Sequence, residues 1–192
     1  MTSKPTLIDR VNHNRQTLRW EECDYAVAGA YFVTICTHER RRLFGSISDG
    51  VMTCNALGRL VEHEWRQTVA KRKSVALDAF VVMPNHFHAI LFIADRTPAR
   101  RGVLPYAPTV GVWQYAPTLR SPSQTLGAIV RGFKGAATAR VNALRRTPGS
   151  PVWQRNYYDR VIRDDEELMR IREYIKENPA NWARDDYNPS SW

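Results

Sequence analysis

The stretch VALDAFVVMPNHFHAILFI, residues 75–93, decides the fold. It contains two apolar runs, at 75–83 and 86–93, which Pro84 and Asn85 separate. Short runs rich in Val, Ile and Phe are typical of strands, and a proline followed by an asparagine is typical of a turn. We therefore expect an antiparallel β-hairpin. Because the second run is apolar at every position after its histidines, its strand should be central and buried.

Predicted strands and helices flank this hairpin on both sides. Strands are predicted where β-branched and aromatic residues cluster, and helices where apolar residues recur every three or four positions. In chain order the elements are strand 30–37, helix 55–71, strands 75–83 and 86–93, helix 124–145, a strand within 152–162 and helix 164–178. This order predicts an α+β fold of the ferredoxin-like (split βαβ) type. Such a fold has an antiparallel four-stranded sheet with two helices on one face, here with an extra C-terminal helix.

Three stretches differ in composition from this predicted domain. Residues 1–28 are polar and suggest an N-terminal arm, and 183–192 suggest a short C-terminal tail. Residues 95–123 contain five prolines and two copies of YAPT, which predicts a basic surface loop. We expect one domain over 29–182, interrupted by this loop.

Composition narrows the class of protein. Hydrophobic residues make up 43% of the 192, enough for a core, and no apolar stretch is long enough to cross a membrane. The N-terminal residues lack the apolar run of a secretory signal, so we expect a cytoplasmic, nucleoid-associated protein without a membrane partner. The cysteines (Cys23, Cys36 and Cys54) form no CxxC pair, so neither a disulfide framework nor a zinc ribbon is indicated.

Positive charge is concentrated in one part of the sequence. The net charge is +9, and no Asp or Glu occurs between Arg96 and Tyr158, where ten Lys or Arg residues lie. Nine of the ten are arginines, whose planar guanidinium can bind a phosphate through two hydrogen bonds. A basic segment on an otherwise balanced body favours a polyanion as partner, although a merely basic surface would have the same composition.

His86 and His88 stand at the start of the second hairpin strand. Residues i and i+2 of a strand point to one side, so the two imidazoles project together, opposite Phe87 and Ala89. Two such imidazoles can chelate a divalent cation. For this motif alone, a hydrogen-bonded pair of histidines is the commoner explanation. No other His or Cys has ligand spacing, which favours an open site with an oxygen ligand over a closed zinc site.

The last predicted helix carries Tyr174 and Asn178, which are four residues apart and so lie one turn apart on the same side. Ile171 and Ile175 flank that side and should dock the helix on the body. An Asn amide oxygen can ligate a hard cation, and a Tyr hydroxyl one turn away could attack a phosphodiester held there. The purely structural explanation is a half-buried Tyr and an Asn that caps the helix.

Several motifs in one order resemble a known family. They are VVMPNHFHAILF (81–92), LGAIVRGFK (126–134), VWQRNYYDRVIRDDEEL (152–168) and REYIKENP (172–179). Together they closely resemble REP-associated tyrosine transposases, relatives of the insertion-sequence transposases that move as single strands. The opening DYAVAGAYFVTICTHERRRLFG also looks like that family, and the resemblance runs from about residue 20 to 182.

The resemblance implies a metal-dependent HUH nuclease and strand transferase acting on single-stranded or hairpin DNA, such as extragenic palindromic repeats. It implies Mg²⁺ or Mn²⁺ bound by His86, His88 and Asn178, and Tyr174 as the nucleophile that forms a 5′-phosphotyrosine intermediate. Many insertion-sequence relatives have Gln where Asn178 stands. Both a monomer and a homodimer are compatible with it. The cations expected to hold DNA are Arg120, Arg131, Lys134, Arg140, Arg145 and Arg155.

Alternatives stay open at this point. Tyr157 and Tyr158 are rival nucleophiles, while Trp113 and Tyr115 either stack on bases or pack within the loop. The main alternative function is a non-catalytic, domesticated single-stranded nucleic-acid-binding protein, because sheets of this plan also bind RNA. A metal-dependent hydrolase of another substrate would want more carboxylates. We expect the acids to cluster at the start of the last helix rather than beside the histidines.

Overall fold

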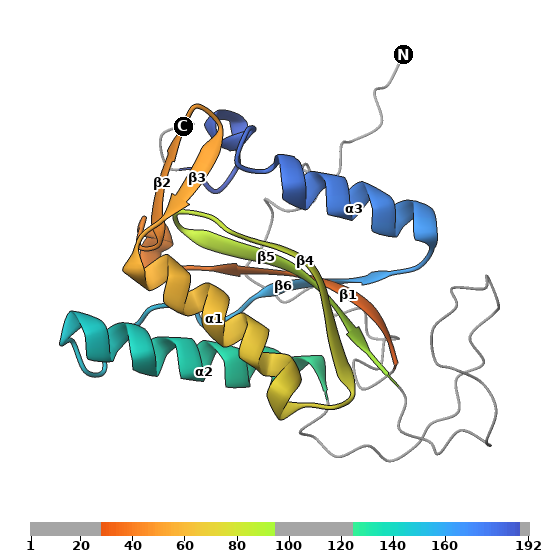
Figure 1. The fold of residues 1–192 in the computed structure, drawn as a ribbon, viewed down its shortest axis with the longest axis horizontal. Helices are drawn as coiled ribbons and strands as arrows, with labels where there is room; N and C mark the ends of the chain where they lie inside the picture. Colours follow the sequence, from red (N-terminus) through yellow and green to blue (C-terminus); the bar gives the residue numbers. More distant parts are fainter. Residues whose placement is uncertain (1–27, 95–124, 189–192) are drawn as a thin grey trace.

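The structure is a computed structural model that describes residues 28–94 and 125–188. Its centre is a four-stranded antiparallel sheet in the order β4-β5-β1-β6 (Figure 1). The strands are β1 (Gly29–Cys36), β4 (Val75–Val82), β5 (His86–Ile93) and β6 (Tyr158–Ile162). This is the strand order of a split βαβ fold, so the ferredoxin-like prediction is confirmed. β5, the strand that begins with the histidines, is central as predicted.

Two helices cover one face of the sheet and the third lies on the other face (Figure 1). Helices α1 (Ala56–Lys71) and α2 (Leu126–Arg145) pack side by side. Between them and the sheet, Trp65 lies edge-on to Phe87 and Phe133 at ring-centroid distances of 5.1 and 5.0 Å. Interlocked aromatic rings of this kind form the main core.

Helix α3 (Asp165–Glu177) docks on the opposite face through a second apolar cluster. Ile171 and Ile175 pack against Ile90 of β5 and Ile162 of β6. An ion pair fixes the helix laterally, since Arg172 donates twice to Asp78 Oδ2, at 2.9 and 2.6 Å. The docking face predicted from the isoleucine spacing is therefore the one that is buried.

Side-chain hydrogen bonds cap the N-terminal ends of helices α1 and α3. The Asn55 side chain accepts from two backbone N–H groups at the start of α1 and so caps this helix. At the start of α3, Asp164 Oδ1 accepts from the Glu167 N–H and the Glu167 carboxylate accepts from the Arg163 N–H, a reciprocal cap. Asn178, the C-cap of α3, keeps helical backbone angles (φ −55°, ψ −42°) although Pro179 follows it and disfavours that conformation.

A second, two-stranded sheet was not predicted. Strands β2 (Gly45–Ser48) and β3 (Val51–Cys54) pair antiparallel beyond the end of β1. Their turn is Asp49–Gly50, with φ of +53° and +73°, the backbone that Asp-Gly favours in hairpins. A side chain at Gly50 would lie 3.2 Å from the Cα of Ala180, so this turn sits closely against the chain after α3.

The stretches expected to differ from the domain are mostly outside the described residues. This holds for nearly all of the arm 1–28 and for the whole loop 95–123. The first residues of the expected tail continue from a 3₁₀ turn (Trp182–Arg184), and Asp185, Tyr187 and Asn188 after that turn are buried. Cys36 and Cys54 are free thiols. Among the described helices, none combines the length and apolar character needed to cross a membrane.

Candidate metal and nucleophile site

The two histidines lie together under helix α3, as the strand spacing predicted. His86 and His88 are fully buried, with ring centroids 4.5 Å apart. Phe87, between them, points to the other side of the sheet, into the core under α1 and α2. The register of the hairpin therefore separates a polar site on one face of β5 from the apolar core on the other.

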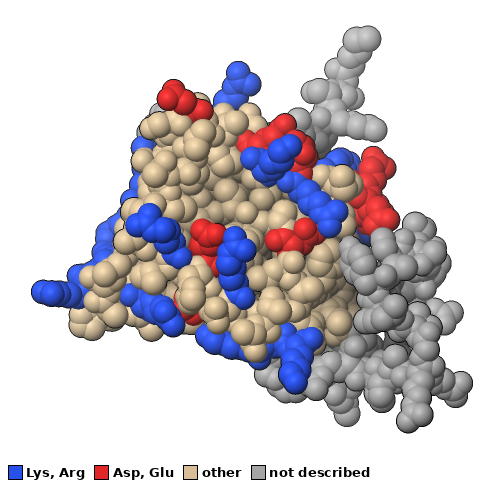
Figure 2. Space-filling view, in the orientation of Figure 1, with Lys and Arg blue, Asp and Glu red and all other residues tan. Residues whose placement is uncertain are grey.

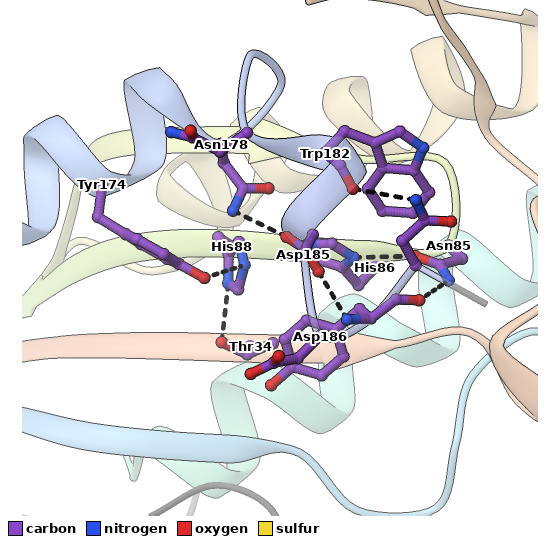
Figure 3. A network of polar contacts seen from close by, with 12 residues as sticks. Thr34, Asn85, His86, His88, Tyr174, Asn178, Trp182, Asp185 and Asp186 are labelled. Atoms are coloured by element: carbon purple, nitrogen blue, oxygen red, sulfur yellow. Dashed lines mark hydrogen bonds and ion pairs between the residues drawn. The ribbon is translucent and has the colours of Figure 1, made fainter. Parts of the chain in front are cut away.

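Asn85 in the hairpin turn fixes the tautomer of His86. Its Nδ2 donates to the backbone carbonyls of Arg40 (3.2 Å) and Tyr187 (2.6 Å), which turns its Oδ1 towards His86 Nδ1 at 2.9 Å (Figure 3). Because an amide oxygen only accepts, His86 Nδ1 carries the proton and donates. His86 Nε2 then presents a lone pair, and it is buried with no hydrogen-bond partner among the described residues.

His88 is oriented in the same manner by two hydroxyls. Its Nδ1 lies 2.8 Å from Thr34 Oγ1, and its Nε2 lies 3.3 Å from the Tyr174 hydroxyl (Figure 3). A hydroxyl both donates and accepts, so these two contacts allow either tautomer of the His88 ring. In the tautomer with the proton on Nδ1, Thr34 accepts that proton, Tyr174 donates to Nε2, and both histidines direct an unprotonated Nε2 into the same space.

Burial keeps both rings neutral. It lowers the pKa of His88 to about 3 and that of His86 well below its usual value, where the neighbouring ring lowers it further. Only the neutral imidazole has a lone pair to give to a metal. The two rings are therefore held in the protonation state that a cation requires.

Asp185, a residue that sequence reasoning missed, completes the group. Its Oδ2 lies 3.9 Å from His86 Nε2, and ligand atoms of His86, His88 and Asp185 all lie within 4.8 Å of one another. We expected the acids to gather at the start of the last helix and not beside the histidines, and that expectation was wrong. Burial raises the pKa of Asp185, while hydrogen bonds from the Tyr187 N–H and the Asn178 amide lower it.

Asn178, the predicted third ligand, faces the same space. Its side chain is 3% exposed, and Nδ2 donates to Asp185 Oδ2 at 3.1 Å (Figure 3). That bond leaves Oδ1 buried and without a partner in the described part of the chain. Asn178 thus ends α3 by position, while its side chain bonds to Asp185 rather than to a helix carbonyl, so that side chain belongs to the buried polar group.

The unsatisfied atoms of this site are acceptors. Buried polar groups normally have partners, and leaving one unpaired costs about 1–3 kcal/mol. Among the described residues, the Nε2 of His86 and the Oδ1 of Asn178 have no donor, and the Nε2 of His88 has only the long contact with Tyr174. A divalent cation would satisfy these lone pairs together, and imidazole nitrogens with amide or carboxylate oxygens are a normal ligand set for one. The residues present therefore fit a metal ion.

The segment that carries Asp185 is held by many contacts. Tyr187 packs its ring on His86 at 4.7 Å, and the Arg40 guanidinium lies 5.3 Å from the same ring and donates to the Asp186 carbonyl. Arg42 donates to Asn188 Oδ1 at 2.7 Å. The signal in the sequence was the pair of aromatic residues Trp182 and Tyr187 around two aspartates, which is unusual for a solvated tail.

Tyr174 lies at the border of the site and is 40% exposed. Its ring is edge-on to His88 at 5.2 Å and to Phe32 at 6.1 Å. Burial and the nearby Asp185 and Asp186 raise its pKa, and the Asn178 amide lowers it. The hydroxyl is thus protonated at neutral pH, within reach of the histidines and of solvent.

The rival tyrosines lie elsewhere. Tyr157 packs against the core under α1 and α2, on the far side of the sheet. Tyr158 is on the same side as the histidines and is 48% exposed, at the outer strand β6. Of the three tyrosines, only Tyr174 is hydrogen-bonded to a histidine of the group in the described structure.

The predicted DNA-binding cations have different environments. Arg131 and Arg155 are exposed, and Arg145 is partly buried. Lys134 donates to three backbone carbonyls at 2.6–3.3 Å, and Arg140 pairs with the buried Glu64 at 2.6 Å, so both are engaged within the protein. Arg120, Trp113 and Tyr115 lie outside the described residues. Figure 2 shows Lys and Arg spread over one face, with Asp and Glu between them.

One comparison with a solved structure agrees with the fold prediction. No protein-family model matches the chain. A solved structure of a REP-associated tyrosine transposase bound to a REP hairpin is 17% identical, with a TM-score of 0.53, over 84% of this chain and 73% of that one. A candidate transposase from Deinococcus radiodurans is 15% identical, with a TM-score of 0.44, over 78% of this chain and 90% of that one.

The fold is therefore that of a REP-associated tyrosine transposase, the class that the motifs predicted. An uncharacterized protein of Haemophilus influenzae is 35% identical over 173 residues, which are 90% of this chain and 92% of that protein. The chain belongs to the family of this Haemophilus protein.

Proposed function

We propose that the protein is a metal-dependent endonuclease and strand transferase for single-stranded DNA. The observation that carries the proposal is the position of Tyr174, whose hydroxyl lies 3.3 Å from His88 Nε2 at the open border of a buried group of metal-ligand atoms. A nucleophile beside a cation site is the arrangement that cleavage of a phosphodiester requires. The transposase fold supports the same function.

The cation would be Mg²⁺ or Mn²⁺, as the family resemblance implies. His86 and His88 would hold it through Nε2, and an oxygen of Asn178 or of Asp185 would complete the protein ligands. When bound, a divalent cation polarises the phosphate and offsets the charge that develops on it. Asn85 and Thr34 serve as outer hydrogen-bond partners that aim the two rings, as such partners do in metal sites generally.

Tyr174 would act as the nucleophile. Its hydroxyl oxygen forms a bond to phosphorus and loses its proton, and the bond from phosphorus to the 3′-oxygen breaks. The products are a 5′-phosphotyrosine and a DNA strand whose 3′-oxygen has taken up a proton. Attack by another 3′-hydroxyl reverses these steps and joins two strands, with the bond energy conserved in the covalent intermediate. The reaction needs no nucleotide cofactor.

The substrate we propose is hairpin DNA with single-stranded flanks, such as an extragenic palindromic repeat. Support comes from the solved transposase of this fold, which is bound to a REP hairpin. It comes also from the net charge of +9 and from the exposed arginines Arg131 and Arg155. Contacts of this kind bind any phosphate backbone and so do not specify the DNA sequence. We propose that the protein works in the cytoplasm on such DNA.

A denaturing gel tests the proposal. Purified protein is incubated with labelled hairpins from the repeats flanking its own gene, with Mg²⁺ or Mn²⁺ and with chelator. We expect a covalent DNA–protein band that needs the metal and disappears in Tyr174→Phe and His88→Ala, but persists in Tyr157→Phe and Tyr158→Phe. Circular dichroism confirms that each variant is folded. A band that survives Tyr174→Phe would refute the assigned nucleophile, and tight binding without any band would favour the non-catalytic alternative.

A further inference from the structure

The sheet face that carries the histidines continues beyond helix α3. Helix α3 packs over β4 and β5, while β1 and then β6 lie farther from it (Figure 3). On this face β1 contributes Phe32 and Thr34, and β6 contributes Tyr158 and Arg160. Tyr158 is 48% exposed and is one of the few large apolar side chains exposed in the described structure.

Two observations place Tyr158 on the site side of the sheet. It is the direct cross-strand partner of Thr34, which is in turn the partner of His88 and is hydrogen-bonded to it. Partners in an antiparallel pair project to the same side. Ile162 lies two positions after Arg160 on the same face of β6 and packs in the apolar cluster under α3. This contact confirms that Tyr158, Arg160 and Ile162 project to the side of the sheet that carries the histidines.

The distance from this ring to the site suits a neighbouring nucleotide. Strands lie about 5 Å apart, so Tyr158 stands two strand spacings, or about 10 Å, from His88 along the sheet. Thr34 lies between them as the cross-strand partner of both, and Phe32, two positions along β1 on the same face, stacks on His88 at 5.4 Å and lies edge-on to Tyr174. Tyr158 also lies close enough to Tyr187 to interact with it electrostatically.

The chemistry of this surface fits an unpaired base. An exposed aromatic ring on a sheet offers a face on which any base can stack. Arg160, two positions along β6, has a side chain that is 43% exposed and pairs with Glu167. A second protein strand would instead need an apolar or uncharged edge, and β6 carries Arg160 and Asp159 there.

We infer that Tyr158 is a positioning residue on which one unpaired base of the DNA flank stacks, next to the phosphate presented to Tyr174. The inference rests on the proposed function. It assigns to Tyr158 a contact with substrate outside the metal site, and with it a role in placing the scissile phosphate. The occupant is a single-stranded nucleotide and not the paired stem, because a base inside a duplex has no free face to stack on the ring.

Binding measurements with abasic DNA test the inference. The hairpin probe carries a fluorescent label and one abasic site, which is moved along the single-stranded flank, and all proteins carry Tyr174→Phe so that binding is read without cleavage. We expect Tyr158→Ala to weaken binding of the intact probe about 5- to 150-fold, the range for loss of one stacked base. Tyr158→Phe should bind as well as Tyr158, and Met169→Ala, an exposed control on α3, should not change binding.

The decisive result is whether the effect of removing a base on binding affinity depends on the presence of Tyr158. At one flank position, removing the base should weaken binding to the protein with Tyr158 and have no further effect on Tyr158→Ala. The inference is overturned if every abasic position weakens both proteins equally, or if Tyr158→Ala binds as tightly as its parent. Covalent band formation by the unmodified protein, measured in parallel, reports separately on the proposed function, so failure of one is distinguishable from failure of the other.

Discussion

Replacing Thr34 with valine should weaken metal binding at the site without changing any proposed ligand. Valine has the shape of threonine but cannot accept the proton of His88 Nδ1, which lies 2.8 Å from Thr34 Oγ1. The residue is 3% exposed, so water cannot replace the lost partner. An unpaired buried donor costs about 1–3 kcal/mol. The ring avoids this cost by changing tautomer, which moves its proton to Nε2, the atom proposed to bind the cation.

The expected loss of metal affinity follows from this competition. Partners that orient a metal-binding histidine typically contribute 10- to 100-fold to affinity, and such a factor corresponds to about 1.4–2.7 kcal/mol. The range agrees with the cost of the unpaired donor, so both arguments predict a similar effect. We therefore expect Thr34→Val to bind Mn²⁺ about 10- to 100-fold more weakly than the unmodified protein.

Calorimetric titration with Mn²⁺ measures this affinity directly, and thermal unfolding without metal measures stability. The matched control is Thr68→Val on α1, a buried threonine (6% exposed) whose hydroxyl bonds to the Glu64 carbonyl on the far side of the sheet. The control should lose some stability and bind Mn²⁺ normally. If Thr34→Val binds Mn²⁺ as tightly as Thr68→Val does, the assignment of His88 Nε2 as a ligand oriented by Thr34 is wrong.

Three further predictions concern the same face of the sheet. Asp185→Asn removes a carboxylate from the ligand group and should weaken Mn²⁺ binding in calorimetry, whereas normal binding would leave Asn178 as the sole oxygen ligand from the protein. The pKa of His88 is lowered from 6.5 to about 3 in the folded protein, so its contribution to stability is complete above pH 6.5 and is lost as the pH falls towards 3. Between pH 6.5 and 5 this loss amounts to about 1.6 kcal/mol, measurable by urea unfolding. His88→Gln should make this dependence shallower without removing it, because burial also lowers the pKa of His86; an equally steep curve in that variant would contradict the contribution of His88. Arg172→Ala removes the partly exposed ion pair with Asp78 and should cost at most about 1 kcal/mol of stability. It should nevertheless slow formation of the covalent band, because α3 positions Tyr174; an unchanged rate would show that the isoleucine contacts suffice.

Local signals account for the parts of the fold that the sequence predicts. The hairpin at 75–93 and the three helices have periodicity or caps within a few residues, and the structure contains each of them. The small sheet of β2 and β3 was missed although its Asp49–Gly50 turn is a strong hairpin signal, because its strands are only four residues long and partly exposed.

The site was predictable only in part, for a different reason. The alternation of one strand places His86 and His88 together, and one helical turn does the same for Tyr174 and Asn178, so short-range geometry predicted the neighbours within each pair. Their proposed roles came from the family resemblance. Asp185 reaches the histidines across about a hundred residues of sequence, through a segment with no regular periodicity. Its position depends on how Trp182 and Tyr187 pack, which only the tertiary structure reveals.

Strand β5 contributes to both the main core and the histidine site, since its odd and even positions face opposite layers of the molecule. Phe87 contacts Trp65 and Phe133 on one side, while the imidazoles on either side of it face α3. Any substitution that lets this strand slide or tilt in the core therefore moves the imidazoles by a similar amount. Substitutions in the core between the sheet and helices α1 and α2 should therefore be restricted by the need to keep the imidazoles in place. This restriction should hold even at positions that do not contact DNA. In a library of core variants, metal affinity should consequently fall together with melting temperature rather than independently of it.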